Sequence, residues 1–129
     1  MNIENNAVRV LLIDDNSEIT ELFATTLTAK GYTVQVTNHG KEGLDLIKKK
    51  ESDLVLLDLA MPGFSGEDVL KELIKDGPIK DYNIYIFTAS IISDQDIDNF
   101  IKLGVTGCLR KPVRLDDVLG VLEKHQTRI

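Results

Sequence analysis

Short apolar runs of strand length alternate along this chain with stretches whose apolar residues recur at helical spacing. This alternation predicts an α/β fold built on a parallel sheet. The runs VRVLLI, LVLLD and IYIF are continuously apolar, as in central strands covered on both faces, whereas TVQV alternates as in an edge strand. The five strands are predicted at Arg9–Ile13, Thr33–Val36, Leu54–Asp58, Ile84–Thr88 and Cys108–Arg110.

A helical stretch follows each predicted strand, with Asn16 or Ser17 as the N-cap of the first and Ser93 opening the fourth. The first helix is expected at about Glu18–Lys30 and the second from near Asn38. The third is expected at about Glu67–Lys75 and the fifth at about Leu115–His125. The expected buried stripes are Ile19, Leu22, Phe23 and Leu27 in the first helix, Leu44 and Ile47 in the second, Ile97, Phe100 and Ile101 in the fourth, and Leu115, Val118, Leu119 and Leu122 in the fifth. Right-handed crossovers place helices on both faces of the sheet, which predicts a doubly wound, three-layer sandwich.

Length and charge limit the function classes. The chain has 129 residues and a net charge of −6, which fits one domain, 1–129 with a core of about 8–126, and disfavours direct nucleic-acid binding. The polar N-terminus has no secretory signal, no apolar run reaches membrane-spanning length, and the single cysteine, Cys108, cannot form an internal disulfide. We therefore expect a cytoplasmic protein without membrane contact.

Chemistry-bearing residues follow the predicted strands. In parallel α/β sheets, ligands bind at the carboxyl ends of the strands, near the topological switch point. Asp14 and Asp15 follow the first strand, Asp58 ends the third, Thr88 ends the fourth and Lys111 follows the fifth. We expect these five residues to meet at one edge of the sheet.

The acidic pair indicates a cation. Adjacent carboxylates repel a free anion, whereas three carboxylates form the hard-oxygen site that Mg²⁺, or Mn²⁺, prefers. Aspartate is a known phosphoryl acceptor, so Asp58 is a candidate nucleophile. Thr88 and Lys111 are the groups that would contact phosphoryl oxygens. Singly, Asp15 could cap a helix and Lys111 could be a surface lysine, but those readings do not explain why all five fall at one sheet edge.

The ordered motifs VLLIDDN, DLVLLDLAMPGFSG, IYIFTAS and LGVTGCLRKP resemble those of receiver domains of two-component response regulators, and the resemblance covers essentially the whole chain. It implies a flavodoxin-like (βα)5 fold with strand order 2-1-3-4-5. It also implies that Asp58 is the phosphoacceptor, that Asp15, Asp58 and the backbone carbonyl of Ala60 bind Mg²⁺ directly, and that Asp14 acts through a metal-bound water. Thr88 would be the switch hydroxyl, and Lys111 would pair with the phosphoryl group and precede a cis proline.

Three features depart from the family pattern. Cys108 stands where the family usually has an aromatic switch residue, so the usual side chain that couples Thr88 to the surface of the fourth helix and fifth strand is absent, and coupling through the segment SIISDQD is the alternative. That segment is one residue longer than usual, and we expect its pair Ile91–Ile92 to be partly exposed. We interpret Cys108 as a buried small apolar residue. Ala60 stands where a polar side chain often positions the attacking water, which favours slow hydrolysis of the phosphoryl group.

The leading hypothesis is a signalling switch rather than an enzyme. A sensor histidine kinase or a histidine phosphotransfer protein would phosphorylate Asp58, and the surface of the fourth helix, fifth strand and fifth helix would change for an unidentified downstream protein. The protein would be a monomer or a phosphorylation-dependent dimer without an output domain.

Other functions remain alternatives. A Mg²⁺-dependent phosphohydrolase with an aspartyl nucleophile generally needs a second carboxylate where this chain has Ala60. An FMN carrier would need a Ser/Thr/Gly-rich first loop in place of DDNSE. A degenerate receiver acting only as a protein-binding module is disfavoured by the complete acidic set.

Overall fold

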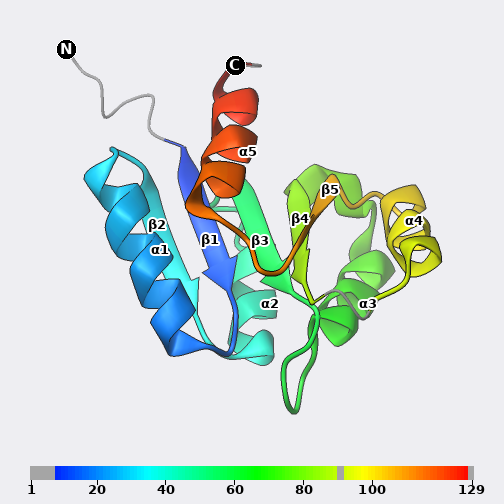
Figure 1. The fold of residues 1–129 in the computed structure, drawn as a ribbon. Coiled ribbons are helices and arrows are strands. Elements are labelled where there is room, and N and C mark those ends of the chain that lie inside the picture. The colour runs from blue at the N-terminus through cyan, green and yellow to red at the C-terminus, as the bar shows by residue number, and fades with distance from the viewer. Residues whose placement is uncertain (1–7, 90–91, 128–129) are drawn as a thin grey trace.

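The computed structural model describes residues 8–89 and 92–127. Five parallel strands form one sheet in the order β2-β1-β3-β4-β5, with helices on both faces (Figure 1). This confirms the predicted doubly wound fold. The elements are β1 (Arg9–Ile13), α1 (Ser17–Ala29), β2 (Thr33–Thr37), α2 (Gly40–Lys48), β3 (Leu54–Asp58), α3 (Gly66–Asp76), a 3₁₀ turn (Ile79–Tyr82), β4 (Ile84–Thr88), α4 (Asp94–Lys102), β5 (Gly107–Arg110) and α5 (Leu115–Thr127).

The core has two layers, one on each face of the sheet. Alternate side chains of the central strands point to opposite faces, and each face is covered by its own helices (Figure 1). One layer packs the sheet against α1 and α5, through residues such as Phe23, Leu27 and Val118. The other packs it against α2 and α3 and, at the β5 edge, α4. Central strands covered on both sides explain the continuously apolar runs of β1, β3 and β4.

The prediction of burial is wrong for two residues, Leu22 and Ile101. Leu22 is 64% exposed and Ile101 is 44% exposed. In α1 the buried residues are Thr20, Phe23 and Leu27, and Leu22 lies about 100° around the helix from Phe23, outside the single face that α1 buries. Helix α4 packs at the edge of the sheet beside the short strand β5, so its last turn is covered on fewer sides (Figure 1).

The strand register brings the polar strand ends to one edge of the sheet. Ile13, the last residue of β1, is paired with Leu57, and Asp58 is paired with Phe87. Thr88 is paired with Arg110, the last residue of β5. Asp14, Asp58, Thr88 and Lys111 therefore lie at neighbouring strand ends, as the sequence predicts.

Candidate functional site

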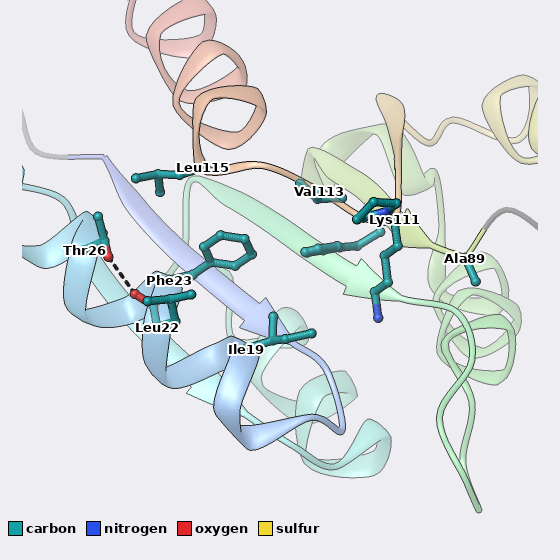
Figure 2. Close-up of a pocket in the computed structure, with 10 residues that line it drawn as sticks. Ile19, Leu22, Phe23, Thr26, Ala89, Lys111, Val113 and Leu115 are labelled. Carbon is teal, nitrogen blue, oxygen red and sulfur yellow. Dashed lines mark hydrogen bonds between the residues drawn. The ribbon is translucent and has the colours of Figure 1, made fainter.

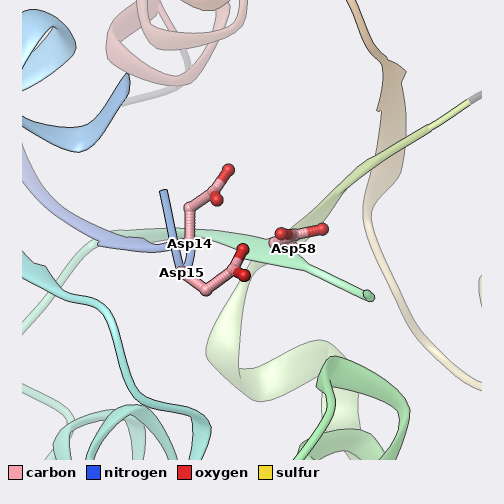
Figure 3. A group of neighbouring side chains, drawn as sticks. All are labelled: Asp14, Asp15 and Asp58. Atoms are coloured by element: carbon pink, nitrogen blue, oxygen red, sulfur yellow. The ribbon is translucent and has the colours of Figure 1, made fainter. Parts of the chain in front are cut away.

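Three carboxylates gather at the carboxyl edge of the sheet (Figure 3). Asp14, Asp15 and Asp58 each offer an oxygen, and these oxygens all lie within 4.8 Å of one another. Asp14 and Asp58 are buried, with 0% and 2% exposure, whereas Asp15 is exposed. A cluster with two buried carboxylates and one open to solvent has the donor chemistry of a Mg²⁺ site that keeps water ligands.

The backbone around Asp14 is fixed by the loop after β2. The Asp14 amide donates to the Thr37 carbonyl at 3.2 Å, and the Asn38 side-chain amide donates to the Asp14 carbonyl at 2.7 Å. Oδ1 of Asp14 accepts the Asn16 amide at 2.9 Å, and Asn16 in turn caps α1. These bonds hold the two neighbouring aspartates in place at the end of β1. The sequence reasoning did not single out Asn38 as a supporting residue.

Asp58 is held from both sides. Its Oδ1 accepts the Ala60 amide at 3.1 Å, and α3 begins next to it, where the Gly66 amide donates to the Leu59 carbonyl at 3.0 Å. A Cβ atom at Gly66 would lie 2.1 Å from the Asp58 carbonyl oxygen, so only glycine allows α3 to begin this close to the strand end. Ser65 caps α3 in a reciprocal capping box with Asp68, which fixes that start.

Lys111 places a positive charge between the two buried carboxylates. Its Nζ lies 2.9 Å from Oδ2 of Asp14 and 3.3 Å from Oδ2 of Asp58. Burial lowers the pKa of Lys111, but the contact with Asp14 and the charges of Asp14 and Asp58 outweigh it and raise the pKa above its ordinary value. The Lys111–Pro112 peptide bond is cis, as the resemblance implied.

Asp58 remains under-neutralised despite Lys111. Burial and the negative charge of Asp14 raise the pKa of Asp58 to about 6, against the lowering effect of the Ala60 amide and Lys111. The Oδ2 atoms of Asp14 and Asp58 accept no well-aligned hydrogen bond from any described residue. The buried hydroxyl of Thr88 likewise has no hydrogen-bond partner within the described part of the chain. The two Oδ2 atoms share the single ammonium of Lys111, and a buried hydroxyl is rarely left without a partner, so this arrangement indicates a site built for a ligand.

A mostly apolar groove runs from this edge along α1. Its volume is about 630 Å³, and Lys111 and Ala89 lie at the end next to the acidic site (Figure 2). Ile19, Leu22 and Phe23 form its α1 side, and Val113 and Leu115 form the opposite side (Figure 2). Leu22 extends from this wall into solvent, which explains why a leucine at helical spacing is not part of the core.

Cys108 and the described part of the segment SIISDQD, from Ile92 onward, lie on the α4 side of the sheet. Cys108 is half-buried and packs against the α4-side core layer, and burial raises the pKa of its thiol. These contacts agree with the predicted apolar packing role, although the side chain is half-buried and not fully buried as predicted. Ser90 and Ile91 lie outside the described residues, and Ile92 is half-buried. Arg110, which the sequence indicates only as part of a charged surface, bonds the Ile92 carbonyl and the Asp94 side chain.

Comparison with known proteins places these features in one family. The sequence matches the response regulator receiver domain over residues 10–123. It is 37% identical over 106 residues to a transcriptional regulatory protein, CpxR homolog, of Haemophilus influenzae, covering 81% of this chain and 44% of that protein. A receiver domain from Clostridium thermocellum superimposes with a TM-score of 0.78 at 30% identity, covering 94% of this chain and 95% of that one. The chemotaxis protein CheY4 of Vibrio cholerae has a TM-score of 0.78 at 26% identity, covering 92% and 98%.

The chain spans about half the length of the regulators that it matches by sequence. Between residues 8 and 89 and between 92 and 127, no helix combines the length and apolar character needed to cross a membrane.

Proposed function

Because this chain belongs to the response regulator receiver family, we propose that Asp58 accepts a phosphoryl group from a phosphohistidine and thereby switches the protein's signalling surface. The observation that carries this assignment is the buried Asp58 carboxylate, whose Oδ2 lies 3.3 Å from the Lys111 ammonium beside Asp14 and Asp15. A phosphoryl acceptor needs a nucleophilic carboxylate together with groups that neutralise phosphoryl charge, and Asp58 with Lys111 beside it supports that assignment.

Receiver domains use Mg²⁺ at an acidic pocket, and the residues present here fit that ion. Asp15, Asp58 and the backbone carbonyl of Ala60 would bind Mg²⁺, or Mn²⁺, directly, and Asp14 would act through a metal-bound water. The sharing of one ammonium by two buried carboxylates and the raised pKa of Asp58 support this assignment, because both indicate negative charge that Lys111 alone does not balance. When bound, the cation supplies neutralisation of charge on the phosphoryl oxygens.

The transfer itself needs only a nucleophile and charge placement from the chain. A carboxylate oxygen of Asp58 forms the new bond to phosphorus as the phosphorus–nitrogen bond of the phosphohistidine breaks, and the electron pair leaves with the imidazole. The ammonium of Lys111 pairs with one phosphoryl oxygen. The hydroxyl of Thr88, which has no hydrogen-bond partner among residues 8–89 and 92–127, donates a hydrogen bond to another.

The apolar groove beside Lys111 is the surface on which we propose that the phosphoryl donor protein docks. Response regulator receivers interact with histidine kinases, and a donor must bring its phosphohistidine to Asp58. The exposed Leu22 and the apolar groove walls offer a surface next to the site for an apolar face of a sensor kinase or a histidine phosphotransfer protein. We further propose that a downstream protein contacts α4, β5 and α5. The protein would act in the cytoplasm, without direct nucleic-acid binding or membrane contact.

The alternatives are weaker at this site. A phosphohydrolase would need a general acid two residues after Asp58, where Ala60 offers none. A degenerate binding module would not need the complete acidic cluster. We propose that the protein only assists its own phosphorylation and slow dephosphorylation. That residues 1–129 form a single receiver domain stays a prediction, as does the monomer or phosphorylation-dependent dimer.

Intact-mass spectrometry after incubation with acetyl phosphate tests this function. We expect one phosphoryl group on the wild-type protein in the presence of Mg²⁺, none in a metal-free control, and none on Asp58→Asn. Absence of both an adduct and released phosphate from folded wild-type protein that binds Mg²⁺ would instead identify a binding module.

A further inference from the structure

Arg110 connects the end of β5 with the start of α4. Its Nη1 donates to the Ile92 carbonyl at 2.9 Å, and its Nη2 lies 2.6 Å from Oδ1 of Asp94, the first residue of α4. These contacts of Arg110 with Ile92 and Asp94 are called the Arg110 clamp below. The clamp joins two segments that lie 16 to 18 residues apart in the sequence.

Arg110 lies at the same edge of the sheet as the acceptor site, because it ends β5. Arg110 immediately precedes Lys111, whose ammonium contacts Asp58. Arg110 is also the register partner of Thr88, and the Lys111 amide donates to the Thr88 carbonyl at 2.6 Å. A shift of Thr88 or Lys111 toward a phosphoryl group therefore moves the backbone that carries Arg110.

The clamp lies on the face of β5 that points toward α4. Residues two apart on a strand share a face, so Arg110 lies on the same side as Cys108. Cys108 packs with the core layer that includes Ile92 and Phe100, which is the α4 side of the sheet. This face, where the family resemblance implies an aromatic switch residue at position 108, holds a small cysteine and a guanidinium bonded to the start of α4.

We propose that the Arg110 clamp transmits phosphorylation of Asp58 to α4, in place of an aromatic side chain at position 108. The inference rests on the proposed function, because it takes a phosphoryl group on Asp58 as the signal. That group would give the hydroxyl of Thr88 its missing partner and draw the paired ends of β4 and β5 toward Asp58. Arg110 then carries the movement to Ile92 and to the first turn of α4, where Ser93 caps the helix through the Asp96 amide at 3.1 Å.

The two bonds of the clamp make it suited to this task. The Asp94 side chain is 95% exposed, and an exposed ion pair alone stabilises a protein little. A planar guanidinium that holds a backbone carbonyl and a carboxylate at once fixes direction as well as distance. The role of the clamp is therefore geometric, and loss of Arg110 should affect coupling more than folding.

Hydrogen exchange of the α4 peptide, with and without beryllofluoride and Mg²⁺, tests the clamp. Beryllofluoride is the probe because it mimics a phosphoryl group on a carboxylate, and ¹⁹F NMR measures its binding independently. For the wild type we expect the probe to change exchange in the first turn of α4 by about fivefold or more, the lower end of typical allosteric coupling. In Arg110→Gln the change should fall below about twofold while the probe still binds within about threefold of wild-type affinity.

Two further variants and a control sharpen the test. Asp94→Asn removes the carboxylate from an exposed position where folding is not at risk, and it should reduce the response in the same direction. The double variant Arg110→Gln/Asp94→Asn should lose little more of the α4 exchange response than Arg110→Gln alone, because both substitutions break the same contact. Arg114→Gln removes an equal charge from the connection after β5, and its guanidinium bonds neither Ile92 nor Asp94 in the structure. It should respond like the wild type.

The possible failures are distinguishable. A full α4 response in Arg110→Gln overturns the clamp and leaves the proposed function intact. Probe binding to the wild type without any α4 response does the same. If beryllofluoride fails to bind the folded wild type with Mg²⁺, the acceptor function itself is contradicted, and the clamp loses its signal with it.

Discussion

Replacing Asp58 by asparagine should stabilise the metal-free protein, because the folded state holds this carboxylate in an unfavourable charged form. Burial and Asp14 raise the pKa of Asp58 from 3.8 to about 6. A pKa difference of this size corresponds to about 3 kcal/mol of folding free energy near neutral pH. Asparagine keeps an oxygen for the Ala60 amide but loses the attraction of Lys111, which still pairs with Asp14. We therefore expect Asp58→Asn to stabilise by about 1–3 kcal/mol.

The pH dependence of folding stability gives an independent check that Asp58→Asn stabilises the protein. Because the folded pKa is raised, folded Asp58 holds its proton up to about pH 6, whereas the unfolded chain releases it near 3.8. The contribution of Asp58 to stability is therefore fully present below about pH 4 and is lost as the pH rises to about 6. Asp58→Asn should lack this loss, and the two proteins should differ most above about pH 6.

Urea unfolding in the presence of EDTA, over about pH 4–8, measures both effects. Asp53→Asn is the matched control, because Asp53 bonds the backbone and side chain of Arg9, and these contacts outweigh burial and lower its pKa. That variant should be destabilised. If Asp58→Asn is no more stable than the wild type at about pH 7.5, or if it keeps the wild-type pH slope, the reasoning about the buried charge is wrong.

Three further predictions concern the same edge of the sheet. Mg²⁺ affinity, measured by calorimetry, should fall about tenfold per pH unit below about pH 6, because protons compete for Asp58, and a flat profile would contradict this. Gly66→Ala should destabilise by about 1–3 kcal/mol in urea unfolding and weaken Mg²⁺ binding, since its Cβ would overlap the Asp58 carbonyl, whereas the same change at exposed Gly120, which has open space around it, should not. Leu22→Arg should slow phosphorylation by a protein donor about tenfold and leave that by acetyl phosphate unchanged; equal slowing with both donors would exclude the groove as a docking surface.

The sequence could predict the site because its residues stand directly at strand ends. Once β1, β3, β4 and β5 are read as neighbouring parallel strands, Asp14, Asp58, Thr88 and Lys111 must lie at one edge. The distances within the edge do not follow from this. That Lys111 bridges both buried carboxylates depends on side-chain conformations that no strand pattern encodes.

Helical spacing predicted burial less well than strand patterns did. Leu22 and Ile101 fit an apolar period, yet α1 buries a single face and α4 lies at the sheet edge. Periodicity shows which residues share a face but not how many faces have a partner. The Arg110 clamp was missed for a related reason, because it joins an arginine that reads as a charged surface residue to a distant backbone carbonyl.

The central claim is that Asp58 is the phosphorylated residue, and mapping the modified atom tests it most directly. Borohydride reduces an acyl phosphate on aspartate to homoserine, which tandem mass spectrometry locates within a peptide. After treatment with acetyl phosphate and Mg²⁺, the account predicts homoserine at position 58 and at no other aspartate, Asp14 and Asp15 included. Homoserine at another position, or an unmodified Asp58 in protein that carries a phosphoryl group, would contradict it.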